Sequence, residues 1–452
     1  MASVTSNDQL KVVVSNKQIL SLALPISFAI LIPQLNMLIN SIFLGRLSQE
    51  ALGNAGITGV FYLIFAVSGH GLNNSIQSVL SKYAGAGKTD YFHLIVSQGL
   101  RIILQFSLFF ILFTWLLAPM ILESVTDPSS YPAEMNFLRI RIFGLPFLYL
   151  FQLGNAILIA TLNSRWLIIG FLIEAAVNIL LDYLLIFGKA GFPAMGFNGA
   201  ALASVMAECT GMIIVFLVLT YTGLKKKYGL FRSFRFNKEL FNEIMTIAIP
   251  LVVQFIISLT TWLIFFILIE TKGTMAKAIS NTMRNVFGLA GIFIWAFAGT
   301  SNTMVANLIG QGKENSVVSA IKRISLWSLG LCLLLISILN LYPQLFFILF
   351  DQDESFINAG IPVIRVVSIG MIMMSVANIW LNGVTGTGKT KINLAIEIFA
   401  VVFYLIYTYY FMQYHYISLA MAWTNELVYW LTILLFSYIF ITSGKWKNRT
   451  LS

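Results

Sequence analysis

Three polar residues, Glu174, Asn178 and Asp182, follow one another at intervals of four within the otherwise apolar stretch 166–187. On a helix their side chains lie on one face, with a drift of about 40° from each to the next. A carboxylate at bilayer depth costs about 3 kcal/mol or more unless it faces a partner or a water-filled cavity. We therefore interpret the stripe as a cation or proton site. The alternative is a polar stripe that only joins helices through hydrogen bonds.

The composition is that of a membrane protein. Of the 452 residues, 58% are hydrophobic and 10% are charged, and the mean hydropathy is +0.85. Apolar stretches of about 20 residues, the length a helix needs to cross a bilayer, recur along the chain. We predict an all-α integral membrane protein without a separate soluble domain, whose main partner is the lipid bilayer. The first apolar stretch is too long for a signal-peptide core, so we expect it to be retained.

We predict twelve membrane spans, and the basic residues orient them. With the N-terminus inside, the inside segments hold 20 Lys and Arg and the outside segments hold four. The positive-inside rule therefore places both termini in the cytoplasm and the protein in the cytoplasmic membrane. The net charge of +10 is then a topology signal, and we expect no nucleic-acid binding. The expected limits of the spans are 18–43, 51–80, 94–121, 136–162, 166–187, 196–221, 241–270, 275–309, 319–350, 358–384, 391–412 and 416–442.

Short sequences recur in the same order in the two halves of the chain. Because each half holds six predicted spans, the halves share one topology and form a parallel repeat. Two such bundles are the architecture of a secondary transporter that works by alternating access. The recurring sequences include ALP and AIP (23–25 and 248–250), GAGK and GQGK (85–88 and 310–313), and FLIE and LAIE (171–174 and 394–397).

The repeat sets the expected domain organisation. We predict an N-terminal six-helix lobe at 1–221 and a C-terminal six-helix lobe at 241–452. The basic, aromatic-rich segment 222–240 lies between them, and we expect it to rest as a linker on the anionic inner leaflet.

Several patterns suggest other chemistry but lack its context. The segment Gly383 to Thr390 fits the P-loop pattern, yet apolar spans lie on both sides of it where a strand and a helix in water are required. We expect no nucleotide binding there. The histidines are scattered, so no metal site is expected. Cys209 and Cys332 fall inside spans and form no disulfide framework. No catalytic constellation is present, so we expect neither enzymatic activity nor a cofactor.

Further polar residues within the predicted spans are candidates for a site. Glu397 and Glu426 repeat Glu174 and Glu208, and we treat Glu208, Glu397 and Glu426 as either a secondary coupling site or remnants of the duplication. Amide side chains cluster in the first two spans. The candidates for a substrate cavity are Gln34, Asn36, Asn73 and Gln77.

The chain resembles the multidrug and toxic compound extrusion (MATE) transporters, a family of the larger multidrug, oligosaccharidyl-lipid and polysaccharide flippase superfamily. The resemblance covers nearly the whole chain, and its most specific part is NILLDYLLIFG at 178–188 followed by FPAMGFNGAALAS at 192–204. It implies export of organic, mostly cationic and lipophilic compounds in exchange for H⁺ or Na⁺. It also implies a central cavity between two lobes and alternating access.

The family's functional residues are only partly present. In many bacterial members an Asp in the first span faces the Asn and Asp that match Asn178 and Asp182. Here the first-span position is Asn40, which removes one carboxylate, and Glu174 could replace its charge. The Glu and Asp that some members carry in spans seven and ten are absent. We predict proton coupling through Glu174 and Asp182, with Na⁺ at Asp182 and Asn178 as the second choice.

A flippase and a channel are alternative functions for this chain. A lipid-linked oligosaccharide flippase of the same superfamily needs several cationic side chains in its cavity, and the span-depth cations here are Arg139, Arg141, Arg284 and Arg365. A channel is disfavoured by the two-lobe repeat. We expect a monomeric exporter of small molecules.

Overall fold

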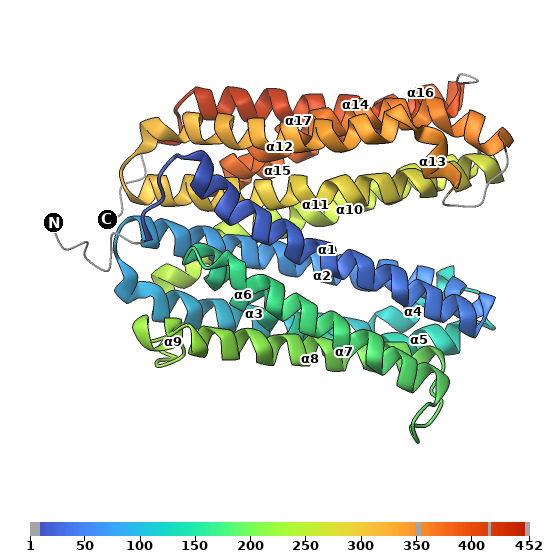
Figure 1. Ribbon diagram of the computed structural model, residues 1–452. Helices are drawn as coiled ribbons and strands as arrows, with labels where there is room; N and C mark the ends of the chain where they lie inside the picture. Colours follow the sequence, from blue (N-terminus) through green and yellow to red (C-terminus); the bar gives the residue numbers. More distant parts are fainter. Residues whose placement is uncertain (1–9, 349–353, 415–416, 448–452) are drawn as a thin grey trace. The chain divides into compact units, whose positions relative to one another are not determined.

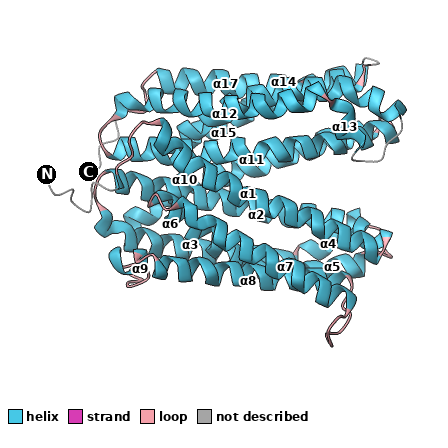
Figure 2. Ribbon diagram, in the orientation of Figure 1, coloured by secondary structure: helices cyan, strands magenta, loops and turns pink. Residues whose placement is uncertain are grey.

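The computed structural model describes residues 10–348, 354–414 and 417–447, and within these ranges it contains only helices, turns and loops (Figure 2). Twelve helical segments are long and apolar enough to cross a membrane. The prediction of an all-α membrane protein with twelve spans is thereby confirmed.

The helices follow the chain in the order of the predicted spans, with short 3-10 turns between several of them (Figure 1). The first half contains α1 (Asn16–Leu47), α2 (Gln49–Gly85), α3 (Phe92–Leu116), α4 (Ala118–Val125), α5 (Tyr131–Arg141), α6 (Leu145–Ala160), α7 (Leu167–Phe187), α8 (Phe197–Tyr221) and α9 (Leu224–Lys227). The second half contains α10 (Lys238–Glu270), α11 (Thr274–Gly310), α12 (Val317–Leu341), α13 (Pro343–Ile348), α14 (Glu354–Gly386), α15 (Thr390–Tyr414), α16 (Leu419–Ala422) and α17 (Asn425–Thr442).

Four predicted spans contain more than one helix, and two of these four are broken near one end at a proline. The stretch 94–121 contains most of α3 and the start of α4, and the stretch 319–350 contains most of α12 and all of α13. Pro119 lies in the first turn of α4, and Pro343 is the first residue of α13. Proline lacks the N–H that would continue a helix but fits a first turn, so each proline begins a new short helix. Residues 349 and 350 lie outside the described residues.

The chain forms two compact units. Unit 1 comprises residues 1–10, 28–84 and 88–252, and unit 2 comprises residues 11–27, 85–87 and 253–452. The start of α1 therefore belongs to unit 2 and the rest of this helix to unit 1. The lobes predicted at 1–221 and 241–452 divide the chain differently, and they stay a prediction.

In unit 1, the helices α5, α6 and α7 all pack on α8. Small residues at its start, Ala200, Ala201 and Ala203, let the neighbouring helices approach closely. The end of unit 1 includes the predicted linker, which is not simply a surface segment. Its residues Leu224 and Leu230 are buried, and the Arg235 carbonyl accepts a hydrogen bond from Gln98 Nε2 of α3 (2.9 Å).

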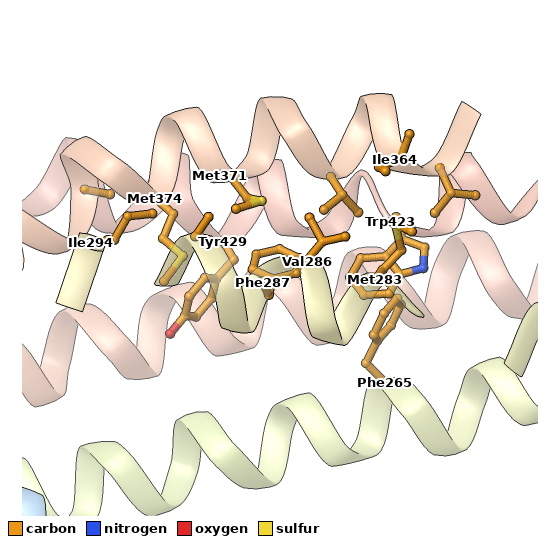
Figure 3. Close-up of a cluster of buried hydrophobic side chains, with 14 of the residues drawn as sticks. Phe265, Met283, Val286, Phe287, Ile294, Ile364, Met371, Met374, Trp423 and Tyr429 are labelled. Carbon is orange, nitrogen blue, oxygen red and sulfur yellow. The ribbon is translucent and has the colours of Figure 1, made fainter. Parts of the chain in front are cut away.

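In unit 2, α11 packs on α12 and α14, and α17 packs on α14 and α15. Figure 3 shows the aromatic and methionine side chains between these helices, including Phe287, Met371 and Trp423. The indole N–H of Trp423 donates to Ser280 Oγ (3.1 Å), so the one polar atom of this ring is satisfied. In a membrane such dispersion contacts and interhelical hydrogen bonds hold helices together, because lipid is as apolar as the helices.

The P-loop-like segment begins in the last turn of α14, which ends at Gly386, and it ends at Thr390, the first residue of α15. Gly388 has φ +72°, a left-handed conformation that glycine adopts without strain. A phosphate-binding loop follows a strand, whereas this segment is a tight turn between two membrane-length helices. The expectation that no nucleotide binds stays a prediction.

Candidate functional site

A cavity of about 150 Å³ lies within unit 1 and brings together residues of α1, α5, α7 and α8. Five of its seven polar lining residues are among the site candidates named from the sequence, whose roles stay a prediction. The lining residues are Pro33, Asn36, Met37, Asn40, Arg141, Glu174, Asn178, Ser204, Ala207 and Glu208.

The amide of Asn178 joins α7 to α1. Its Oδ1 accepts hydrogen bonds from Asn36 Nδ2 (2.7 Å) and Asn40 Nδ2 (3.0 Å). The Oδ1 atoms of Asn36 and Asn40 are buried and have no hydrogen-bond partner among the described residues. Two amide oxygens next to the Asn178 side chain are thus left with free lone pairs, which is an arrangement that suits a cation or a proton donor.

Asp182 lies one helical turn beyond Asn178 and is completely buried. Neither of its carboxylate oxygens has a hydrogen-bond partner within the described residues. An ionised carboxylate in this environment costs several kcal/mol, and a bound proton or cation would reduce that cost. Asp182 does not line the cavity; the amides of Asn36, Asn40 and Asn178 do.

Glu174 lies in the cavity and packs against α8 at Gly211. A β-carbon at position 211 would lie 3.3 Å from Glu174 Oε2, closer than most side chains approach each other. Glycine at this position therefore gives the carboxylate room beside α8. The three residues share one face of α7 as the spacing predicts: Glu174 and Asn178 line the cavity, and Asp182 is buried one turn farther along the helix.

Glu208 is held by a cation that the sequence analysis did not assign to the site. Arg141 Nη1 donates to Glu208 Oε2 (2.7 Å) and Nη2 donates to Oε1 (2.5 Å), which is a bidentate pair. Both side chains are largely buried, with 13% of Arg141 and 6% of Glu208 exposed. The Arg141 guanidinium also lies 3.8 Å from the centre of the Tyr62 ring, whose hydroxyl donates to Glu208 Oε1 (3.3 Å).

The remaining candidates lie elsewhere. Asn73 donates from Nδ2 to Gln152 Oε1 (3.1 Å), which joins α2 to α6. Gln77 is buried and Gln34 is half-buried, and neither lines the cavity described above. Their assignment to a substrate cavity stays a prediction. Glu397 and Glu426 belong to unit 2 and are both buried.

Of the four arginines at span depth, Arg141 lines this cavity. Arg139 lies over the Trp115 ring at 5.3 Å, and Arg284 and Arg365 are exposed. The only signal that could have singled out Arg141 in the sequence is its depth within a span. Its partner is 67 residues away on another helix, so the pairing itself could not be read from a pattern.

Comparison with known proteins decides the family. A family model described as MatE matches residues 25–184 and again residues 250–410, so each match begins at the proline of one ALP or AIP sequence. This chain belongs to the MatE family. The resemblance to MATE transporters is thereby confirmed, and with it a multi-pass membrane transporter rather than an enzyme family.

Relatives of this MATE protein extend over nearly its full length. It is 22% identical to a probable multidrug resistance protein NorM of Thermotoga maritima, over 96% of this chain and 93% of that protein. It is also 22% identical to a probable multidrug resistance protein NorM of a Synechocystis species, over 79% of each chain. A solved outward-facing multidrug resistance MATE transporter has the same fold, with a TM-score of 0.87, 16% identity and coverage of 98% of this chain and 100% of that one.

Proposed function

We propose that this protein exports small, lipophilic organic cations across the cytoplasmic membrane in exchange for protons. The observation that carries the proposal is Asp182, a fully buried carboxylate whose oxygens both have no partner among the described residues. Such a group binds a cation or a proton with a large gain over its empty, ionised state. The relatives that are described as multidrug resistance proteins support drugs as the substrate class.

The charges of the cavity favour a cationic substrate. Glu174 and Glu208 contribute two carboxylates to its lining and Arg141 contributes one guanidinium. Because Glu208 and Arg141 neutralise each other, Glu174 supplies the uncompensated negative charge when it is ionised. Protonation of Glu174 and Asp182 removes the negative charge and with it the attraction for the exported cation.

Exchange follows if the proton and the exported cation stabilise different conformations of the transporter. A ligand shifts such an equilibrium only by the difference between its affinities for the two states. We infer that protonated carboxylates favour the state that releases the drug, and that ionised carboxylates favour the state that binds it. The distribution of basic residues predicts separately that both termini lie in the cytoplasm.

Sodium is the second candidate for the coupling ion. A sodium ion at Asp182 and Asn178 needs neutral oxygen ligands, and the Oδ1 atoms of Asn36 and Asn40, which lie beside Asn178, have no partner among the described residues. Oxygen ligands of this kind suit a hard cation, whereas a proton needs only one acceptor.

A flippase for lipid-linked oligosaccharides is less well supported. Recognition of a pyrophosphate needs unpaired cations, and the one arginine in the unit 1 cavity already forms a bidentate pair with Glu208.

The proposal is tested by proton release on substrate binding. Purified protein in weakly buffered detergent solution is mixed with ethidium, and the pH change is recorded. We expect the wild type to release protons and Asp182→Asn to release fewer or none while it remains folded. Asp90→Asn makes the same chemical change at an exposed residue and should behave as wild type. Proton release that is unchanged in Asp182→Asn would refute the assignment.

A further inference from the structure

A second polar network lies in unit 2, around Glu397. This residue is 1% exposed, and its Oε1 accepts a hydrogen bond of 2.6 Å from the Tyr429 hydroxyl. The Tyr429 hydroxyl is also 3.2 Å from Ser258 Oγ. Figure 3 shows the Tyr429 ring within the apolar cluster of unit 2, with its hydroxyl pointing away from Met371. Residues of α10, α15 and α17 thus meet at one carboxyl group.

Gln254 of α10 is the fourth residue of the network, and one of its two polar atoms has no hydrogen-bond partner among the described residues. Its Nε2 donates to Glu397 Oε2 over a long 3.4 Å, and its Oε1 is buried without a partner among the described residues. Gln254 is only 6% exposed, so water does not replace the missing donor freely. A buried acceptor without a donor costs about 1–3 kcal/mol. The Gln254 amide oxygen therefore lacks a donor in the arrangement that the structure shows.

A proton on Glu397 supplies that donor. With Glu397 ionised, the amide donates from Nε2 to Oε2, as the structure shows. When Oε2 takes a proton from the aqueous phase, a half-turn of the Gln254 amide brings Oε1 to the same position, and the new carboxyl O–H donates to it. The two protonation states thus differ by one O–H bond and one side-chain rotation, and the link between α10 and α15 is kept in both.

The groups around Glu397 fit a proton better than a metal ion. Tyr429 and Gln254 direct donors toward the carboxylate, whereas a metal ion needs lone pairs directed inward. No cation of the described residues pairs with it: Arg365 of α14, which packs on α15, and Lys391 of α15 are both exposed. Tyr404 and Glu426, the other titratable groups nearby, are bonded to each other at 3.4 Å.

The repeat shows why this glutamate differs from its counterpart. Glu397 and Glu174 occupy matching positions in LAIE and FLIE. In unit 1 the neighbouring helix offers Gly211, and Glu174 opens to a cavity. In unit 2 the neighbouring helix offers Tyr429, whose hydroxyl bonds to Glu397. The two matching carboxylates therefore differ in their surroundings: Glu174 faces a cavity, and Glu397 is enclosed by hydrogen-bond donors.

We propose that Glu397 is a second proton-binding site of this transporter, and that Gln254 accommodates both of its protonation states. The inference does not depend on the coupling role of Asp182, because every residue that carries it belongs to unit 2.

The test is an infrared titration of the protein reconstituted in liposomes, which follows the C=O stretch of protonated carboxyl groups as the pH changes. We expect the wild type to show a pH-dependent component that is lost in Glu397→Gln. In Gln254→Leu this component should remain but shift in frequency, because the carboxyl O–H loses its acceptor. Gln254→Leu also carries the test if Glu397→Gln does not fold.

Two control variants separate this site from the others. Asp182→Asn removes the proposed unit 1 site, and Glu426→Gln removes a second buried glutamate of unit 2. Both should keep the component that shifts in Gln254→Leu. A spectrum of Glu397→Gln identical to that of the wild type would overturn the proposal. So would a component that is unaffected by Gln254→Leu, or one that disappears at constant pH when sodium replaces potassium.

Discussion

Gly144 determines whether the Arg141–Glu208 pair can form. A β-carbon at this position would lie 2.5 Å from Arg141 Nη1 and closer still to Glu208 Oε2. The pair is held in the cavity wall between α5 and α8, so neither side chain can withdraw into solvent. The missing side chain of one residue thus makes room for two charged groups.

The Gly144→Ala variant should therefore lose about 1–3 kcal/mol of stability by overpacking and should displace the ion pair. Thermal unfolding in detergent, followed by tryptophan fluorescence, measures the loss. Gly56→Ala is the matched control, because a β-carbon at position 56 meets nothing within 4 Å. Equal melting temperatures for the two variants would contradict the role given to Gly144.

The buried pair itself is expected to be strongly non-additive. Arg141→Gln or Glu208→Gln leaves one charge without its partner and should cost about 3 kcal/mol or more. The double variant Arg141→Gln/Glu208→Gln leaves no charge and should be more stable than either single variant. A double-mutant cycle of thermal unfolding measures this coupling, and additive losses would show that the two groups do not depend on each other.

For single residues, the sequence predicted the features that depend on one helix alone. The spacing of Glu174, Asn178 and Asp182 placed them on one face of α7, and the structure has them there. The hydrogen bonds from Asn36 and Asn40, and the pairing of Glu208 with Arg141, depend on how separate helices meet. No local pattern carries that information, so these partners had to come from the structure.

Among the elements, the linker differs most from its expectation. The sequence predicts a surface segment on the inner leaflet, yet Tyr228 is 7% exposed and its ring lies 4.9 Å from that of Phe92 on α3. Burial raises the pKa of the Tyr228 phenol from 10.0 to about 12. The basic residues predict that the linker lies on the cytoplasmic side, and this stays a prediction. The burial of its apolar residues follows from the surface that α3 offers.

This pKa gives the linker a pH dependence of known sign. Because the folded protein holds the Tyr228 proton more tightly than the unfolded chain does, the stability from the buried phenol is fully present below pH 10.0 and is lost as the pH rises toward about 12. Tyr228→Phe carries no such proton. We expect the melting temperature of Tyr228→Phe to rise relative to the wild type between about pH 8 and about pH 11. A difference that is independent of pH would show that Tyr228 is not enclosed.

Helix limits were predicted well where apolar runs end in loops. The limits that were wrong include Leu117 and Tyr342, where α3 and α12 end inside the predicted spans. A hydropathy pattern continues across these points because the residues remain apolar. Only the prolines that follow, Pro119 and Pro343, mark the interruptions, and a proline near the start of a new helix resembles one inside a longer helix.

For the whole molecule, the duplication is the clearest feature of the sequence. The MatE model matches the two halves separately, from residue 25 and from residue 250, which are the prolines that the repeat aligns. Yet the two units are not copies in their chemistry. Unit 1 has a cavity with a charged pair, and unit 2 has a glutamate enclosed by neutral donors. Each unit must therefore be tested by its own variants.

The measurement that tests the central claim most directly is ethidium efflux from proteoliposomes under an imposed pH gradient and, separately, an imposed sodium gradient. Wild type, Asp182→Asn and the exposed control Asp90→Asn are compared. We predict efflux with the pH gradient alone, at wild-type rate in Asp90→Asn and lost in Asp182→Asn. Efflux driven only by the sodium gradient would show that sodium, and not the proton, is the coupling ion. Full pH-driven efflux in Asp182→Asn would contradict the account.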